Sequence, residues 1–398
     1  MPVTTTVKVK LYTDKAADAA FTEVCKVYAS ACDMVSSYVF ETEQYYRSSE
    51  TWHEQLYCKI REEFGLKSQM TCSVFRTVKS SYKTVNTQLK NEPYTFKCGG
   101  EKYSFHRNLD WLEKPISFRK PFCDLARGRD WSFVTKGDET FLSINTMDKR
   151  ISVPHNHHFD ETLFTEGVTL GAAKLLKRNS IWYLHISMTV DADEPVYKRI
   201  CGHDRGLRFV VTTYDGEKTT FVNGCDIAKK RDKYHRTRKS LQKKNTRGAR
   251  RVLARISGRE NRWINDVNHC LSKALTAVPD TLHVIEDLTG ISFNDDNLKD
   301  KDYSRELRSW SFYDLEMKMA YKAALNRSEV IKVPPKYTSQ RCPKCGHIHK
   351  DNRQKENHLF KCLSCGYESN DDRVAGMNLR ELGVRYMQTG ELSGFSKQ

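Results

Sequence analysis

Several features are missing from this sequence of 398 residues. It has no apolar run long enough to span a membrane, and its first residues, MPVTTTVKVK, lack the apolar core of a signal peptide. It has no internal repeat and no low-complexity tract apart from one basic stretch. Hydrophobic residues make up 38% and aromatic residues 11% of the chain, so we expect two or three globular domains and no membrane partner.

Acidic residues are also fewer than basic ones. Asp and Glu number 50 against 66 Lys and Arg, which gives a formal net charge of +16. A positive excess of this size indicates a polyanionic partner, either a nucleic acid or an anionic membrane surface. Because the features of a membrane protein are missing, nucleic acid is the favoured interpretation.

Closely paired cysteines are a minority. Nine of the thirteen cysteines are scattered singly. This pattern predicts buried thiols in a reducing compartment rather than a disulfide framework, so we expect a cytoplasmic protein.

The remaining four cysteines form two CxxC motifs, each followed by Gly: Cys342, Cys345, Cys362 and Cys365. Zn²⁺ prefers four tetrahedral thiolates, and this spacing predicts a structural Zn²⁺ site with no open position. The alternative is four unrelated buried thiols. His347, His349 and His358 lie between the motifs and could replace a ligand, but surface or nucleic-acid contacts are favoured because four cysteines suffice.

Hydrophobic periodicity divides the chain. Residues 3–11 alternate as in a strand, and helical spacing follows from residue 17 to about residue 89. Short segments of period two return in residues 116–190, which predicts a small antiparallel barrel with a helical insert after its first strand. Beyond a linker-like segment, residues 191–195, strands and helices mix as in an α/β domain built around a sheet.

Three carboxylates occupy positions suited to metal chemistry. Asp204 and Glu286 each interrupt or end an apolar strand pattern, and Asp372 opens the last helix. Hard cations take oxygen ligands, and two Mg²⁺ ions can flank one phosphate during phosphodiester cleavage. Taken singly, the three acids could also be a solvent-facing strand end, a surface acid and a helix cap. Asp287 and Asp371 are rival neighbours that spacing alone does not exclude.

The basic stretch is residues 229–262, with fifteen Lys or Arg against two acids. Four arginines recur every four residues and are predicted to share one helical face, with two lysines just before them: Arg247, Arg251, Arg255, Arg259, Lys243 and Lys244. Like charges on one face cost stability unless phosphates neutralise them, so a nucleic-acid contact is favoured over a solvated surface helix.

The motifs around the three acids resemble the TnpB family of transposon-encoded RNA-guided nucleases and, through it, the compact type V CRISPR effectors. Residues 202–207 resemble the first RuvC motif, residues 284–290 the second, and residues 372–378 the third, while residues 333–346 resemble the stretch leading into the family's zinc finger. The resemblance covers about residues 198–383. In the amino-terminal half only the order of elements matches.

The resemblance implies a multidomain α+β and α/β fold. A wedge β-barrel would comprise residues 1–14 and 93–195, with a helical recognition lobe at 15–92. An RNase H-like RuvC domain would comprise residues 196–341, with a zinc-finger insert at 342–366 and a carboxy-terminal RuvC part at 367–398.

The resemblance also implies an activity, namely RNA-guided cleavage of DNA beside a short flanking motif by one RuvC site with two Mg²⁺ ions. Asp204, Glu286 and Asp372 would be catalytic, and the partners would be a guide RNA and double-stranded target DNA. The basic stretch would then contact the guide RNA or its hybrid. In the family the recognition lobe and barrel read the flanking motif, which suggests a nucleic-acid role for Arg76, Lys79 and Lys83, although core packing and solvation are favoured for most residues there.

The sequence departs from the family's pattern at Arg205, Val374 and Gly376, and none of these changes removes a metal ligand. Three alternatives remain open. The chain could be a compact type V CRISPR effector that uses a CRISPR RNA, a non-cutting RNA-guided regulator, or an unguided transposase or junction nuclease.

Overall fold

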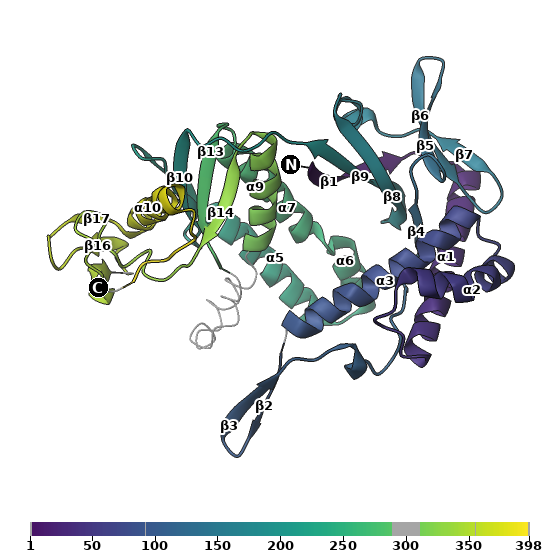
Figure 1. Cartoon of the computed structure of the whole chain (residues 1–398), viewed down its shortest axis with the longest axis horizontal. Coiled ribbons are helices and arrows are strands. Elements are labelled where there is room, and N and C mark those ends of the chain that lie inside the picture. Colours follow the sequence, from purple (N-terminus) through teal and green to yellow (C-terminus); the bar gives the residue numbers. More distant parts are fainter. Residues whose placement is uncertain (1, 92, 289–310, 355, 397–398) are drawn as a thin grey trace. The chain divides into compact units, whose positions relative to one another are not determined.

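The structure, a computed structural model, describes residues 2–91, 93–288, 311–354 and 356–396. Within these residues no helix is both long and apolar enough to cross a membrane. The chain forms two compact units, one comprising Pro2–Asp191 and the other beginning at Ala192 (Figure 1). The boundary between them falls inside the linker-like segment of the sequence.

The strands of the first unit form two larger sheets and a hairpin. One antiparallel sheet has the order β1-β9-β8-β4 and another the order β5-β6-β7, while β2 pairs with β3. Isolated bridges pair Leu11 with His155 and Arg127 with Trp131, so the two larger sheets are joined at their ends. The strands are β1 (Pro2–Leu11), β2 (Tyr94–Cys98), β3 (Glu101–Phe105), β4 (Phe122–Leu125), β5 (Trp131–Lys136), β6 (Glu139–Asn145), β7 (Arg150–Val153), β8 (Val168–Arg178) and β9 (Ile181–Asp191).

Three helices follow β1, as the helical spacing predicts: α1 (Lys15–Glu41), α2 (Ser49–Phe64) and α3 (Ser68–Asn91). Asp14 caps α1 by accepting a 2.7 Å hydrogen bond from the Ala17 N–H, and Gly65 ends α2 in the left-handed conformation. The apolar faces of these helices and of the strands share one core, whose large members include Phe21, Tyr28, Trp52, Phe75, Trp131 and Trp182. A short helix, α4 (Asp160–Leu163), precedes β8.

One mixed sheet organises the second unit. Its order is β12-β11-β10-β13-β14, with β10 antiparallel to β11 and parallel to β13. The strands are β10 (Arg199–Asp204), β11 (Phe209–Tyr214), β12 (Thr219–Asn223), β13 (Thr281–Glu286) and β14 (Glu329–Val333).

Helices cover both faces of this sheet. The described helices of this unit are α5 (Cys225–Lys244), α6 (Arg247–Ile256), α7 (Arg259–Leu275), α9 (Phe312–Leu325) and α10 (Asp371–Thr389), of which α7, α9 and α10 pack on the sheet. Leu282 and Val284 of β13 pack with α10, whereas Ile285 packs with α7 and α9. Alternate residues of a strand point to opposite faces, so the even-numbered residues of β13 face α10.

Glycines let α10 lie very close to the sheet. A Cβ atom on Gly202 of β10 would lie 2.1 Å from the Gly376 carbonyl oxygen, and a Cβ on Gly383 would lie 2.5 Å from Val284 Cγ2. Neither approach is possible with a larger residue unless the helix moves. The close packing fixes the amino-terminal end of α10 against the sheet.

The segment between β14 and α10 contains the CxxC motifs and a small sheet of order β15-β16-β17. Its strands are β15 (Arg353–Gln354), β16 (Leu359–Lys361) and β17 (Glu368–Asn370). The expected mixed α/β architecture is therefore present, with a four-cysteine cluster in the second unit.

Candidate active site

Asp204 and Glu286 end neighbouring parallel strands on the same face of the sheet. Asp204 is the last residue of β10 and Glu286 the last residue of β13. The register pairs Gly202 with Val284 and His203 with Ile285, so the two acids follow in line. Both therefore point to the face that α10 covers.

Asp372 comes to the same place from the first turn of α10. The helix is capped by Asn370, whose side chain accepts a 3.0 Å hydrogen bond from the Arg373 N–H. The cap interpretation of Asp372 is therefore wrong, because the side chain of Asn370 caps the helix instead. The Asp372 carboxylate lies 3.7 Å from Arg353 Nη2.

The three acids line one cavity of about 420 Å³. The cavity is also lined by Thr338 from the loop after β14, by Arg353 and His358 from the cysteine-rich segment and by Asp371 of α10. Thr289 and Gly290, the last two residues of the second sequence motif, lie outside the described residues.

The electrostatics of the cavity favour a bound cation. Burial raises the pKa of Asp204 well above its usual range, and the neighbouring Glu286 and Asp372 raise it further. Burial also raises the pKa of Glu286 and of Asp372, with Asp371 adding to the latter. Carboxylates held together in this way repel one another when ionised, and a divalent cation removes that cost. The donor set, all carboxylate oxygen, suits a hard cation such as Mg²⁺.

Two side chains that sequence reasoning missed hold Glu286 in place. The Thr338 hydroxyl donates a hydrogen bond to Glu286 Oε1 and so works against the burial that raises the glutamate pKa. Buried Asn378 of α10 donates to the carbonyl oxygens of Thr338 and Arg341 at 2.7 and 2.8 Å. The third sequence motif thus supplies Asp372 and, through Asn378, also helps to position Glu286. Motif spacing alone could not reveal this second contribution.

The two rival acids differ in their surroundings. Asp287 lies 3.8 Å from Lys332 and is not among the described residues that line the cavity. Asp371 does line it, but it is fully buried and accepts a 2.8 Å hydrogen bond from Arg353 Nε. His358, which sequence analysis places at the surface or on nucleic acid, lies with Asp371 and Asp372 in one group of possible ligand atoms.

Arg205, the departure in the first motif, is a buried cation beside the acids. Its Nη2 donates to the Glu286 carbonyl oxygen, and its Nη1 lies 3.5 Å from the Glu316 carboxylate. It also lines the cavity, so the arginine adds positive charge next to Asp204 without displacing it.

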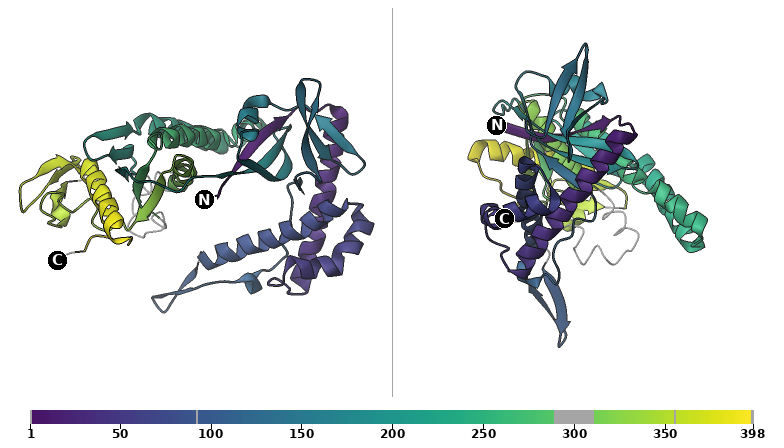
Figure 2. Two further views of the ribbon diagram at one scale, coloured as in Figure 1. Left: turned by 45° about the horizontal axis from the view of Figure 1, so that its top comes forward. Right: turned by 90° about the vertical axis from the view of Figure 1, so that its right-hand side faces the viewer.

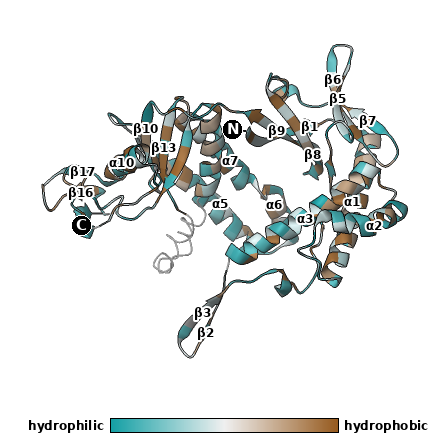
Figure 3. Ribbon diagram, in the orientation of Figure 1, coloured by the Kyte–Doolittle hydropathy of each residue, from teal (hydrophilic) through white to brown (hydrophobic). Residues whose placement is uncertain are grey.

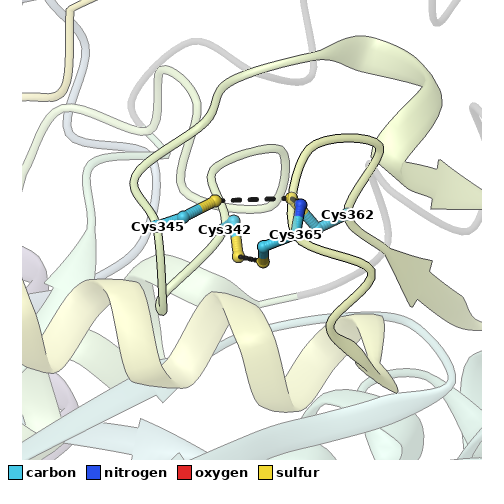
Figure 4. Close-up of side chains that lie close together, drawn as sticks. All are labelled: Cys342, Cys345, Cys362 and Cys365. Carbon is cyan, nitrogen blue, oxygen red and sulfur yellow. Dashed lines mark hydrogen bonds between the residues drawn. The ribbon is translucent and has the colours of Figure 1, made fainter.

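The four cysteines of the two CxxC motifs converge in the folded chain (Figure 4). Cys342 Sγ lies 3.6 Å from Cys365 Sγ, and Cys345 Sγ lies 3.5 Å from Cys362 Sγ. Sulfurs on a tetrahedral Zn²⁺ ion at the usual bond length are about 3.8 Å apart, so the cluster fits zinc. Gly346 and Gly366 take positive φ angles of 77° and 69°, as the turn after each motif requires.

The single cysteines are only partly as expected. Cys25, Cys32, Cys123 and Cys201 are buried, but Cys58, Cys98, Cys225 and Cys270 are exposed and Cys72 is intermediate. The expectation of buried thiols is wrong for the exposed four, because they lie on helix faces or a hairpin that no core covers. All thirteen cysteines are free of disulfides.

The basic stretch forms a helical pair and the start of a third helix. No residue of α5 is buried, and most of this helix has hydrophilic colours in Figure 3. Lys243 and Lys244 end α5, and Arg247, Arg251 and Arg255 are exposed on α6. The prediction that Arg259 continues the same face is wrong, because α6 ends at Ile256 and Gly258, at φ +70°, separates it from α7.

The basic face of α3 is used unequally. Arg76 and Lys83 are exposed. Lys79, in contrast, donates to the carbonyl oxygens of Tyr45 and Arg47 and lies 5.3 Å from the Trp52 ring centroid. Burial lowers its pKa, as expected for an ammonium group that serves the packing of α2 and α3.

Comparisons with known proteins bear on the identity of the chain. A family model described as "Cas12f1-like, TNB domain" matches residues 312–379, the stretch from α9 through the cysteine cluster into α10. The TnpB-like protein MJ0751 of Methanocaldococcus jannaschii is 30% identical over 200 residues, which are 48% of this chain and 67% of that protein. The chain belongs to the TnpB family.

Two further relatives of this TnpB-family chain are named as DNA endonucleases. The CRISPR-associated endodeoxyribonuclease Cas12f1 of Sulfoacidibacillus thermotolerans is 32% identical over 51% of this chain and 50% of its own length. The putative RNA-guided DNA endonuclease InsQ of Escherichia coli is 29% identical over 53% of this chain and 56% of its own length. The chain thus spans about half the length of these curated relatives.

Solved structures support the fold of this TnpB member. The Cas12f1 chain in a Cas12f1–sgRNA–target DNA complex superposes with a TM-score of 0.57 at 15% identity, covering 91% of this chain and 81% of that one. The mini-RNA-guided endonuclease CRISPR-Cas phi3 gives a TM-score of 0.53 at 11% identity, covering 98% and 93%. At such low identities these similarities concern the fold alone.

Proposed function

We propose that this TnpB-family chain is an RNA-guided DNA endonuclease that cleaves target DNA beside a short flanking motif. The observation that carries the proposal is the single cavity lined by Asp204, Glu286 and Asp372, which come from two strands and a helix far apart in sequence. The relatives named as RNA-guided or CRISPR-associated DNA endonucleases support the choice of substrate.

In this proposal the three acids are the catalytic residues and hold two Mg²⁺ ions. When bound, such ions help to form the attacking hydroxide and stabilise the leaving oxygen at a phosphodiester. The chain contributes the rest of the arrangement. Thr338 orients Glu286, Arg353 neutralises Asp371 beside Asp372, and Arg205 supports the backbone at Glu286. The four cysteines would hold one structural Zn²⁺ ion.

The proposed domain layout follows the family. The mixed sheet with its parallel β10–β13 pair and the helix α10 would be an RNase H-like RuvC domain, residues 196–341 and 367–398, with the zinc-finger insert at 342–366. The sheets of the first unit, residues 1–14 and 93–195, would be the wedge barrel, and helices α1 to α3, residues 15–92, the recognition lobe. The connection of the two sheets by isolated bridges is compatible with a barrel that is only partly closed.

The proposed partners are a guide RNA and double-stranded target DNA. The exposed basic residues of α5 and α6 and the first residue of α7 would contact phosphates without reading sequence. Lys243, Lys244, Arg247, Arg251, Arg255 and Arg259 are all exposed, as this role requires. Arg76 and Lys83 are available for a similar role, whereas Lys79 is used internally.

A second candidate is a compact type V CRISPR effector whose guide is a CRISPR RNA. The 32% identity to Cas12f1 and the match to the Cas12f1-like TNB domain favour it. The two candidates share one chemistry and differ in the origin of the guide. Sequencing the RNA that co-purifies with the protein separates them, because a CRISPR repeat at a fixed position identifies the effector.

The test of the proposal is Asp204→Asn in the full chain, assayed with co-purified RNA and a matched DNA target. We expect cleavage to fall by about three orders of magnitude or more, while RNA binding is unchanged, because an amide keeps the shape but cannot hold a cation as a carboxylate does. Asp287→Asn, which alters the neighbour outside the cavity, is the matched control and should cut normally. Full cleavage by Asp204→Asn would remove this residue from the site, and loss in both variants would point to misfolding.

A further inference from the structure

The hairpin formed by β2 and β3 carries an aromatic face. The register places Tyr94 opposite Phe105 and Phe96 opposite Tyr103, so all four rings share one face. The ring centroids are 5.3 Å apart in the first pair and 5.4 Å in the second, whose planes are nearly parallel at 21°. Trp111 extends the row, with its centroid 5.2 Å from that of Phe105.

This aromatic face is open to solvent. Tyr94 is 47% exposed, Phe96 41%, Tyr103 46% and Trp111 57%, and every residue of β2 is exposed. Figure 2 shows the hairpin extending beyond the end of α3 within the first unit. A hairpin of two strands is only marginally stable by itself, and large aromatic side chains usually enter a core. Their gathering on an uncovered face indicates a ligand surface.

Positive charge accompanies the rings. The Arg107 guanidinium lies 5.7 Å from the Tyr94 ring centroid. The Nδ1–H of His106 donates a 2.7 Å hydrogen bond to the Lys90 carbonyl oxygen, which ties the hairpin to α3. A polyanion with flat apolar groups would satisfy both the rings and the arginine.

We propose that the aromatic face of the hairpin stacks the unpaired bases of single-stranded RNA, with Arg107 beside the phosphates. Phe96 and Tyr103 form the central platform, and Tyr94, Phe105 and Trp111 continue it. Glu101 lies at the tip, where its carboxylate accepts a hydrogen bond from the Tyr103 hydroxyl. A carboxylate repels phosphate but accepts from a ribose 2′-hydroxyl, a donor that DNA lacks, and this favours RNA. The proposal rests on the proposed function only in that RNA is a partner.

The test measures binding of the full chain to a fluorescein-labelled oligouridine of about 20 nucleotides, which forms no duplex. Phe96→Ala combined with Tyr103→Ala should weaken binding about 10-fold or more, because the two aromatic rings on which bases would stack are removed. The loss should persist at about 0.5 M salt, where phosphate contacts fade. Phe96→Tyr should bind normally, whereas Phe96→Leu, which keeps an apolar side chain without a ring, should lose affinity. Thr95→Ala, an exposed neighbour on the same strand, is the matched control.

Several outcomes would overturn the proposal. Unchanged oligouridine binding in the double variant removes the hairpin from RNA binding. An equal loss for oligothymidine of the same length rejects the preference for RNA. Normal binding with Phe96→Leu rejects stacking, and a change from dimer to monomer in sedimentation at unchanged affinity identifies a protein–protein surface. Because no cleavage is measured, these results are independent of whether Asp204→Asn abolishes cutting.

Discussion

The four-cysteine cluster and the acid cavity lie in the same unit but are assembled by different means. The cysteines are brought together by two short turns and one small sheet, so every ligand lies within residues 342–365. The acids come from residue 204, residue 286 and residue 372, and they meet only because a parallel strand pair and a closely packed helix exist. The first site depends on local chain geometry, and the second depends on the packing of the whole sheet.

The most severe test of this comparison is Gly202→Ala. Its Cβ would meet backbone of α10, which no rotamer change can relieve. We expect the free energy of unfolding to fall by about 3 kcal/mol and cleavage to fall with it, while zinc content stays constant. Thermal denaturation, cleavage and metal analysis are the measurements. Gly248→Ala on α6, where nothing lies within 4 Å of the added carbon, is the control and should be neutral or slightly stabilising.

Cys342→Ser tests the local site. The substitution removes one of four thiolate ligands, so we expect zinc content to fall from about one ion per chain to near zero. The Cys342 side chain is buried and packs with Phe360 and with Val374 of α10. The segment around residues 342–365 should then lose protection from hydrogen exchange, and the start of α10 should loosen. Cys270→Ser, at an exposed thiol, should change neither quantity. Full zinc content in Cys342→Ser would show that the cluster is not a zinc site.

Thr338→Val tests whether the cavity depends on its supporting hydrogen bonds. Loss of the hydroxyl removes a donor from Glu286 and should raise the pKa of that carboxyl further, since the Thr338 bond lowers it. We expect about 10-fold slower cleavage and a higher Mg²⁺ concentration for half-maximal activity. Thr338→Ser should restore both. Unaltered cleavage in the valine variant would mean that the geometry of Glu286 is held by the strand alone.

The smallest effect is expected from Arg251→Ala combined with Arg255→Ala on α6. Both side chains are exposed, so folding should be unaffected while RNA affinity falls several-fold. The slope of affinity against salt should become shallower by about two ion equivalents. Arg61→Ala, an exposed arginine on α2, should leave the slope unchanged. If the slope of affinity against salt is unchanged in the double variant, these arginines contact no phosphate and remain in solvent.

Periodicity and motif spacing were sufficient for several elements. The alternation of residues 3–11 corresponds to β1, and the helical spacing up to about residue 89 corresponds to α1, α2 and α3. Interruptions were harder to predict. The spacing of four residues predicts that Arg259 continues the arginine face of α6. The helix ends before Arg259, however, and only the folded chain shows that Gly258 adopts a left-handed conformation there. The exposure of four cysteines was not predicted for a related reason, since the burial of a thiol depends on which face of its helix or strand packs against the core.

The sequence by itself determined the four zinc-type ligands, because the contacts of a CxxC turn are local and two residues of spacing dictate them. It also determined the three acids as candidates and the positive charge that indicates a nucleic-acid partner. Only the tertiary structure decided that Asp204 and Glu286 share a face, that Asn370 rather than Asp372 caps α10, and that Thr338 and Asn378 support Glu286. Apart from the Asn370 cap, which is local, these contacts join residues 40 or more positions apart. No local pattern encodes the strand register and helix packing that create them.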